Sequence, residues 1–237
     1  MYSFKSRIRY SELDCEGKLS MASLLDYFQD CSTFQSEDAG VGIAYMKEIG
    51  QVWVVSSWQV VVERYPRLGE EVVIGTFPYA FKSFLGYRNF FMETPGGEVL
   101  ARANSLWSLV DLNTGKLVSV SQEMLSKYPL EEKLPMDYAH RKIALPQDSE
   151  AKAPVVITEQ HLDTNHHVNN GQFVNIAMSY LPENFEIRQL RAEYKKQAFL
   201  DDVLYPCVAV HDSGCVVNLG DKEGKTYVAV EFLRKEK

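Results

Sequence analysis

The densest group of polar side chains lies at residues 161–170, where three histidines and three asparagines fall within ten positions. Within it, Asp163, Asn165 and His167 form an Asp-x-Asn-x-His array. A carboxylate and an imidazole can together activate a water molecule, and an amide can donate a hydrogen bond to a developing oxyanion. A helix expected to begin near Asn170 would add unpaired backbone N–H groups at the same place. The array therefore predicts acyl transfer to water.

Several residues of this stretch have simpler interpretations. Asn169 or Asn170 suits the N-cap of the following helix, because a short amide side chain accepts a hydrogen bond from a free backbone N–H. His161 and His166 suit surface or packing roles. Three histidines could suggest zinc, but no cysteine ligand or spaced histidine motif accompanies them, so we predict no metal site.

The composition of the chain excludes several classes of protein. With 237 residues and 46% apolar side chains, the chain can bury a core and is one large or two small domains. A net charge of -7 argues against nucleic-acid binding. No run approaches the ~20 apolar residues of a membrane helix, so we predict no membrane insertion. Four cysteines without a CxxC pair, and an N-terminus without a signal-peptide core, predict a cytoplasmic protein.

The elements that must position the array follow from periodicity. Apolar residues at helical spacing predict a helix over Met21–Asp38, with Ser20 as N-cap and Gly40 at its end. It is followed by a run of β-branched and aromatic segments separated by turn signals, which predicts an antiparallel sheet. The predicted strands of this first half are Val52–Arg64, Glu71–Phe81, Phe84–Glu93, Val99–Asp111 and Lys116–Val120.

The same order of elements recurs after a proline-rich stretch at 128–154, which has the composition of a linker. A short strand is predicted at Val155–Gln160 and a helix at Asn170–Leu181. The predicted strands that follow are Glu186–Lys196, Val203–His211, Cys215–Gly220 and Thr226–Leu233.

Residues repeat along with the elements. Segment 13–19 aligns with 162–168 at an offset of 149, and segment 69–72 aligns with 200–203 at an offset of 131. The second copy is therefore about eighteen residues shorter between its helix and its next strand. Glu16 and Lys18 stand in the first copy where Asn165 and His167 stand in the second. We infer that the second copy carries the chemistry and the first acts as a scaffold.

A duplicated strand–helix–sheet unit has a physical consequence for its sheets. A single unit leaves a sheet edge open, and open edges must be paired or protected. Two tandem units can pair edge to edge into a continuous sheet around both helices. We therefore predict an α+β protein whose ligand site lies in the groove between the units.

Several stretches resemble the acyl-acyl carrier protein thioesterases, a family with two tandem hotdog folds. Segment 162–170, LDTNHHVNN, is similar to the family's LDxNxHVNN signature. Segments 60–66 (VVVERYP), 104–117 (NSLWSLVDLNTGKL) and 191–203 resemble further family segments in the same order. The resemblance implies antiparallel sheets that each wrap a long central helix, in an N-terminal hotdog unit at 1–127, a linker at 128–154 and a catalytic C-terminal unit at 155–237. It implies hydrolysis of fatty acyl thioesters of acyl carrier protein.

Carried over by position, the family motif gives catalytic roles to Asp163, Asn165 and His167. The family's glutamate and cysteine on the following strand align with Gln197 and Ala198. Ala198 cannot be a nucleophile, and Gln197 can orient water or an acyl carbonyl but cannot act as a general base. His167 is the expected base, because the pKa of an imidazole suits neutral pH. Asp163 would orient His167 or attack as a nucleophile.

The resemblance also implies where the substrate binds. The N-terminal unit of the family holds the acyl chain, so we expect apolar contacts from Leu24, Phe28, Trp53, Trp58, Phe84 and Trp107. Acyl carrier protein is acidic, so its docking needs a local cationic face. The candidates for carrier docking are Arg188, Arg191, Lys195 and Lys196.

Two alternatives stay open at this point. An acyl-CoA thioesterase would share the fold and the chemistry, and a non-catalytic acyl-binding protein would share the fold alone. We expect acyl carrier protein as the partner and no cofactor. Homodimer formation and the preferred acyl chain length are left open.

Overall fold

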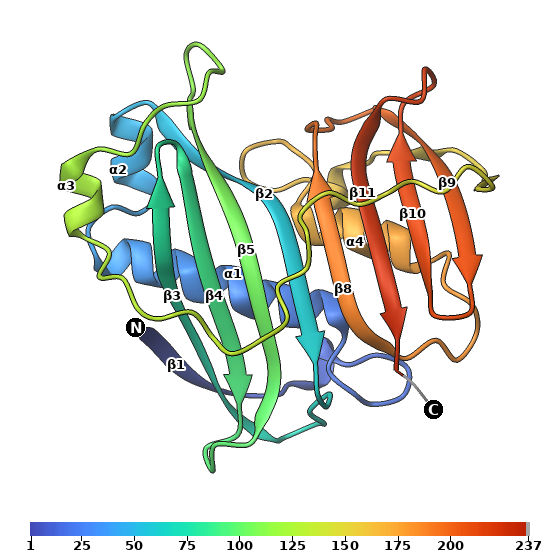
Figure 1. The fold of residues 1–237 in the computed structure, drawn as a ribbon, viewed down its shortest axis with the longest axis horizontal. Coiled ribbons are helices and arrows are strands. Elements are labelled where there is room, and N and C mark those ends of the chain that lie inside the picture. The colour runs from blue at the N-terminus through green and yellow to red at the C-terminus, as the bar shows by residue number, and fades with distance from the viewer. Residues whose placement is uncertain (236–237) are drawn as a thin grey trace. The chain divides into compact units, whose positions relative to one another are not determined.

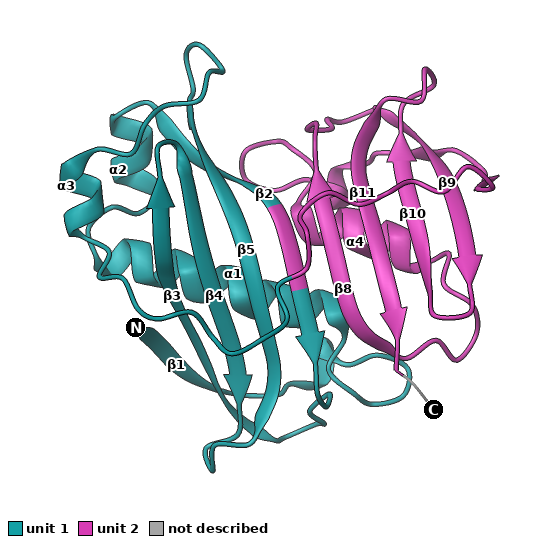
Figure 2. Cartoon of the chain, in the orientation of Figure 1, with its two compact units in different colours: residues 1–56, 60–138 teal, residues 57–59, 139–237 magenta. Residues whose placement is uncertain are grey.

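The structure is a computed structural model that describes residues 1–235. The chain forms two compact units (Figure 2). Unit 1 contains residues 1–56 and 60–138, and unit 2 contains Ser57–Gln59 and the chain from Ala139 onward. No helix within residues 1–235 has the length and apolar character needed to cross a membrane.

The long helix of unit 1, α1, spans Met21–Asp38 as predicted. The hydroxyl of Ser20 accepts a hydrogen bond from the Ser23 N–H at 3.1 Å, which caps the helix. Its buried face includes Leu24 and Phe28. The chain leaves the helix through Gly40, whose φ of +72° suits a residue without a side chain.

The sheet of unit 1 has the order β1-β3-β4-β5-β2, with antiparallel β1–β3, β3–β4 and β4–β5 pairs. Helix α1 crosses one face of this sheet (Figure 1). The strands are β1 (Tyr2–Arg7), β2 (Gln51–Val62), β3 (Glu71–Lys82), β4 (Leu85–Glu93) and β5 (Val99–Asp111). Short helical segments occur at η1 (Tyr10–Glu12), α2 (Ile43–Glu48) and α3 (Gln122–Ser126).

One predicted strand of unit 1 is wrong. Residues 116–120 form an isolated bridge between Val110 and Leu117, with backbone hydrogen bonds on either side of it, instead of a strand. Asp111 explains the tight turn before it, because its carboxylate accepts hydrogen bonds from the N–H groups of Asn113 and Thr114 at 3.0 and 2.8 Å. The chain then leaves the sheet and turns into α3.

The sheet of unit 2 has the order β8-β11-β10-β9-β6, and β7 also pairs with β9. Its antiparallel pairs are β8–β11, β10–β11 and β9–β10, and its helix α4 packs on β10 and β11. The elements are β6 (Glu150–Ala151), β7 (Val155–Val156), η2 (Glu159–His161), α4 (Asn170–Met178), β8 (Ile187–Tyr194), β9 (Val203–His211), β10 (Gly214–Gly220) and β11 (Thr226–Arg234).

Two predicted boundaries of unit 2 are too long. The strand expected at Val155–Gln160 stops at Val156, and a 3₁₀ turn follows it. The helix expected to reach Leu181 stops at Met178. Pro182 disfavours a helical conformation at Leu181, the residue before it. The N–H groups of Tyr180 and Leu181 donate instead to carbonyls three residues earlier, which ends the α-helical pattern.

Matching backbone hydrogen bonds establish the internal repeat and correct its register. In unit 1 the Gly69 N–H donates to the Ile8 carbonyl at 2.9 Å, and in unit 2 the Asp201 N–H donates to the Ile157 carbonyl at 3.0 Å. Gly69 and Asp201 also share a positive φ, of +79° and +66°. Gly69 therefore corresponds to Asp201, an offset of 132 residues between the units, whereas the sequence alignment predicted an offset of 131 for this segment.

Residues 128–154, expected to form a linker, pack onto the units at both ends. Tyr128 is 4% exposed and joins a buried cluster of unit 1. Ile143 is 1% exposed and packs with Val216 and Ala229 in unit 2. The Ile143 N–H donates to the Glu193 carboxylate at 3.1 Å, which satisfies a buried acid of β8.

Candidate active site

The polar loop before α4 is closed by its own backbone. Leu162 and Val168 form an isolated antiparallel bridge. Between them, the Asp163 N–H donates to the His167 carbonyl at 2.8 Å. The Asp163 Oδ1 atom accepts from the N–H of Asn165 at 2.8 Å and from the N–H of His167 at 3.4 Å. The carboxylate of Asp163 thus fixes the backbone on which Asn165 and His167 stand.

Unit 1 builds the same loop from different side chains. The Asp14 Oδ1 atom accepts from the N–H groups of Glu16 and Lys18 at 2.9 and 3.0 Å. The residue with positive φ is Gly17 at +74° in this loop, and His166 at +61° in unit 2. An aspartate holds the loop in both units. The role of this aspartate in building the loop therefore does not depend on the other side chains, which differ between the two units.

The loop of unit 2 is tied to the start of α4 and to the segment after β8. Asn169 is the N-cap of α4, and its Oδ1 atom accepts from the Gly171 N–H at 2.7 Å. The Val168 N–H donates to the Ala198 carbonyl at 2.9 Å. This bond brings the segment of Gln197 beside the loop. Gln197 itself is exposed.

The two side chains expected to touch substrate differ in exposure. Asn165 is exposed, whereas His167 is half-buried. The His167 ring packs edge-to-face on Phe199, with ring centroids 4.9 Å apart and planes at 83°. The structure therefore brings Asp163, Asn165 and His167 together on one loop, with Gln197 on the adjoining segment.

His161 and His166 lie outside this arrangement. The His161 Nδ1 atom accepts from the Thr158 N–H at 3.0 Å, which caps the 3₁₀ turn η2. Glu12 does the same in unit 1, where its Oε2 atom accepts from the Arg9 N–H at 2.8 Å. Within residues 1–235, no group of three or more His, Cys, Asp or Glu side chains is arranged to hold a metal ion.

Three of the six residues expected to bind the acyl chain lie in or against the core of unit 1. Leu24 and Phe28 are at most 1% exposed on α1, and the Phe28 ring lies 5.4 Å from that of Phe90. Trp53 is partly buried and lies 6.1 Å from the ring of Phe81.

The other three candidates for acyl binding occupy different places. Phe84 sits in the β3–β4 turn, and its carbonyl accepts from the Leu109 N–H at 2.9 Å. Trp107 donates from its indole N–H to the Ser105 hydroxyl at 2.7 Å. Trp58 is 3% exposed and belongs to unit 2.

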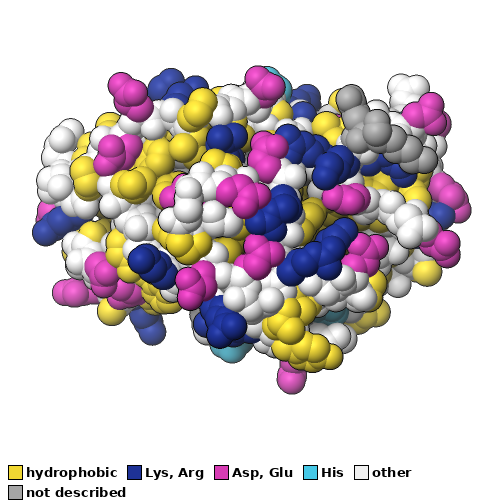
Figure 3. All heavy atoms as spheres, turned by 90° about the horizontal axis from the view of Figure 1, so that it is seen from below, with side chains coloured by type: hydrophobic (Ala, Val, Ile, Leu, Met, Phe, Trp, Pro, Cys, Tyr) yellow, Lys and Arg dark blue, Asp and Glu magenta, His cyan; other side chains and the backbone are white. Residues whose placement is uncertain are grey.

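The basic residues of β8 and its continuation are largely paired with acids. Arg191 lies 3.2 Å from a Glu231 carboxylate oxygen, and its side chain is 16% exposed. Lys195 lies 3.4 Å from Glu193. Arg188 lies where the β8–β11 register shifts. Basic and acidic side chains are interspersed on the face drawn in Figure 3.

Lys196 has several partners at once. Its ammonium group lies 3.6 Å from Asp221, donates to the Tyr227 hydroxyl at 3.2 Å and sits 4.3 Å from the centre of that ring. The hydrogen bond to Tyr227 raises the pKa of Lys196. Lys195 and Lys196 remain the most exposed cations of the predicted group.

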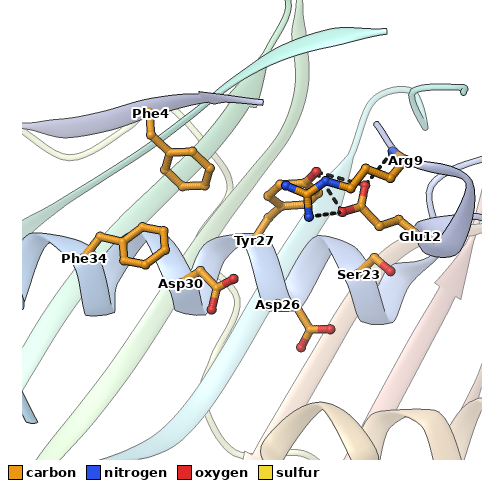
Figure 4. Close-up of a pocket in the computed structure, with 8 residues that line it drawn as sticks. All are labelled: Phe4, Arg9, Glu12, Ser23, Asp26, Tyr27, Asp30 and Phe34. Carbon is orange, nitrogen blue, oxygen red and sulfur yellow. Dashed lines mark hydrogen bonds and ion pairs between the residues drawn. The ribbon is translucent and has the colours of Figure 1, made fainter. Parts of the chain in front are cut away.

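A hollow of about 280 Å³ on unit 1 was not predicted (Figure 4). It lies between β1 and the outer side of α1, and contains none of the predicted site residues. Desolvation raises the pKa of both Asp26 and Asp30 at its edge. Its lining residues are Phe4, Arg9, Glu12, Ser23, Asp26, Tyr27, Asp30 and Phe34.

Comparisons with known proteins agree with this architecture. Residues 1–128 match the model of the acyl-ACP thioesterase N-terminal domain. A chloroplastic palmitoyl-acyl carrier protein thioesterase of Gossypium hirsutum is 26% identical over 93% of this chain and 58% of that protein. The chain thus spans little more than half the length of this relative.

Two solved structures show the same fold over nearly the whole chain. An acyl-ACP thioesterase of Bacteroides thetaiotaomicron has a TM-score of 0.89 and 20% identity, and the match covers 98% of this chain and 97% of that one. The 12:0-ACP thioesterase of Umbellularia californica has a TM-score of 0.87 and 22% identity, and covers 99% and 98% of the two chains.

Two successive units, each an antiparallel sheet crossed by one helix and each starting its helix from the same loop, define a tandem hotdog protein. The family model matches more than half of the residues, in the N-terminal part of the chain. The chain belongs to the acyl-ACP thioesterase family.

Proposed function

We propose that this chain hydrolyses the thioester of fatty acyl-acyl carrier protein and releases the free fatty acid. Family membership supports the thioester hydrolase class, and the Gossypium relative bears the name of a thioesterase acting on acyl carrier protein. The reaction is assigned to the loop at 162–170 of unit 2.

One observation carries this assignment. The two units share a loop with the same backbone hydrogen bonds, yet only unit 2 places an amide and an imidazole on it, at Asn165 and His167. In unit 1 the corresponding Glu16 and Lys18 neutralise each other in an ion pair of 2.8 Å. Backbone support is common to both loops, so the difference in side chains points to chemistry.

The proposed reaction uses each side chain for one task. His167 removes a proton from water as the water oxygen bonds to the thioester carbonyl carbon. The Asn165 amide donates a hydrogen bond to the carbonyl oxygen as negative charge develops there. The carbon–sulfur bond then breaks, and the imidazolium returns the proton to the thiolate. Gln197 orients the water or the acyl carbonyl.

Asp163 contributes to this scheme through the backbone. Its Oδ1 atom holds the N–H groups of both Asn165 and His167. The proposed role is therefore to fix the separation and direction of the base and the oxyanion donor, which accelerates a reaction by positioning.

The acyl chain and the carrier are assigned to separate surfaces. Apolar residues of the unit 1 core, such as Leu24 and Phe28, are proposed to contact the acyl chain, where each buried methylene contributes about 0.8 kcal/mol. Lys195 and Lys196 are proposed to attract the acidic carrier, because they are exposed and directly precede Gln197.

A thiol-release assay tests the proposed function. The full chain is given acyl-acyl carrier protein and acyl-CoA substrates of increasing chain length, and free thiol is measured. We expect thiol release, with higher kcat/KM for carrier-linked substrates. Binding of acyl thioesters without any thiol release would contradict the proposal. Faster thiol release from acyl-CoA than from acyl-acyl carrier protein would instead identify acyl-CoA as the substrate.

The same assay examines the carrier surface. Charge reversal of Lys195 and Lys196 to Glu should raise KM for carrier-linked substrate and leave KM for acyl-CoA unchanged. Lys127→Glu is the control, because Lys127 is an exposed lysine at the end of α3 in unit 1. Equal losses on both substrates would argue against docking.

A further inference from the structure

The ring of His167 has one aromatic neighbour that the proposed reaction does not use. Phe199 meets it edge-to-face, with centroids 4.9 Å apart and planes at 83°. Phe199 is 48% exposed, so this ring pair lies at the surface of unit 2.

Phe199 stands on a rigid turn. Its N–H donates to the Asp202 Oδ2 atom at 2.9 Å, and its carbonyl accepts from the Asp202 N–H at 3.2 Å. Ala198, just before it, accepts the Val168 N–H from the catalytic loop at 2.9 Å. The backbone of Phe199 is thus fixed relative to the loop that carries His167.

The carboxylate expected to orient the imidazole is engaged elsewhere. The Asp163 Oδ1 atom accepts the backbone N–H groups of Asn165 and His167. Within the described part of unit 2, the His167 ring makes no hydrogen bond, and its ring contact is with Phe199. A base without a hydrogen-bonded orienting partner depends on packing to hold its ring.

The first unit gives a natural comparison. At the corrected register, Phe199 corresponds to Arg67, and His167 corresponds to Lys18. Lys18 and Arg67 form a backbone bridge there. The aromatic pair therefore occurs in the unit with the imidazole, and two cations replace it in the other unit.

We propose that Phe199 is a positioning residue that holds the imidazole of His167 in its reactive orientation. This inference rests on the proposed function. An edge-to-face aromatic pair is stabilised by the positive ring edge against the negative ring face. Loss of this contact lets the His167 ring populate unproductive rotamers, so the fraction of enzyme ready to accept the proton falls.

Two substitutions of Phe199 distinguish the effect of its aromatic ring from the effect of its apolar volume. Phe199→Leu keeps an apolar side chain and removes the aromatic ring, whereas Phe199→Tyr keeps the ring. Leu200→Ala is the matched control, because Leu200 is the adjacent residue and is 44% exposed. We expect Phe199→Leu to lower kcat roughly 3- to 10-fold with KM unchanged, as expected for loss of one aromatic contact. Phe199→Tyr and Leu200→Ala should retain kcat within about twofold.

A spectroscopic measurement keeps the inference testable apart from catalysis. The imidazole signals of His167 in NMR spectra, assigned with His167→Gln, should lose their ring-current shift and broaden in Phe199→Leu, while Phe199→Tyr retains them. If thiol release is absent but these shifts behave as stated, the proposed function fails and the positioning contact stands. An increase in KM alone, equal effects of Leu and Tyr, or unchanged His167 signals in Phe199→Leu would overturn the inference.

Discussion

At the residue scale, Asp163 shows how one side chain can support a reaction through the backbone. Its Oδ1 atom gathers the N–H groups of Asn165 and His167, and Asp14 does the same for Glu16 and Lys18. The aspartate is common to both loops and the chemistry is not. The carboxylate of Asp163 therefore has a structural role, and it contributes to the proposed reaction by holding the loop in place.

A pair of matched substitutions tests this division. Asp14→Ala and Asp163→Ala should each lower the free energy of unfolding by about 1–2 kcal/mol, because two backbone N–H groups lose a charged acceptor. Urea unfolding of both variants measures this loss. Only Asp163→Ala should also reduce kcat, by about 10²-fold or more, since only its loop carries the base and the oxyanion donor. A large fall in kcat for Asp14→Ala would contradict the assignment to unit 2.

At the element scale, α1 shows both what periodicity predicts and what it leaves out. The helix at Met21–Asp38 was predicted with its bounds, because its apolar stripe is regular and Ser20 and Gly40 are strong end signals. The strand Val99–Asp111 was also predicted with its bounds. The strand predicted at Lys116–Val120 was wrong, because the segment pairs with its neighbours through scattered backbone hydrogen bonds and a single bridge, not through a continuous ladder.

The outer side of α1 carries an unfavourable pair of charges. Asp26 and Asp30 are one helical turn apart and lie at the same hollow (Figure 4). Desolvation raises the pKa of both, and the charge of Asp30 adds to the rise at Asp26. Because both side chains are exposed to solvent, their repulsion lowers the free energy of unfolding by only about 0.2–0.5 kcal/mol, the size of a like-charge pair on a helix surface.

The pH dependence of this cost has a definite sign. A raised pKa in the folded state means that the folded chain keeps its proton at a pH where the unfolded chain releases it. The stabilising effect is full below the unfolded pKa, near 3.9, and is lost as pH rises through the folded pKa. Asp26→Asn should therefore raise Tm by about a degree at pH 7 and leave it unchanged at pH 3. A Tm increase of equal size at both pH values would contradict this explanation, and Asp212→Asn in the β9–β10 turn provides the control.

At the scale of the whole molecule, two units of the same plan differ in detail. Both units retain the loop, its aspartate and its backbone hydrogen bond to the segment after a strand, while the helix is shorter in unit 2 (Asn170–Met178) than in unit 1 (Met21–Asp38). The order of elements made the tandem fold predictable from sequence. Agreement with the fold of two acyl-ACP thioesterase structures extends over nearly the whole chain.

The part of the site that sequence did not predict has a physical explanation. The Asp-x-Asn-x-His array was recognisable because local spacing places its members on one loop. Phe199 lies beside that loop because the neighbouring Ala198 carbonyl accepts a hydrogen bond from the distant Val168 N–H. A one-residue error in the repeat register also aligned Phe199 with Leu68 instead of Arg67. The backbone bonds of Gly69 and Asp201 reveal the correct pairing.

The central claim is that the imidazole of His167 drives the hydrolysis. Steady-state thiol release from acyl-acyl carrier protein by His167→Ala tests it most directly, with His166→Ala as the control, since His166 is the exposed neighbour on the same loop. We expect kcat to fall at least 10²-fold in His167→Ala, within the range expected for loss of a general base, and to stay within about twofold in His166→Ala. Near-wild-type turnover by a folded His167→Ala variant would contradict the account.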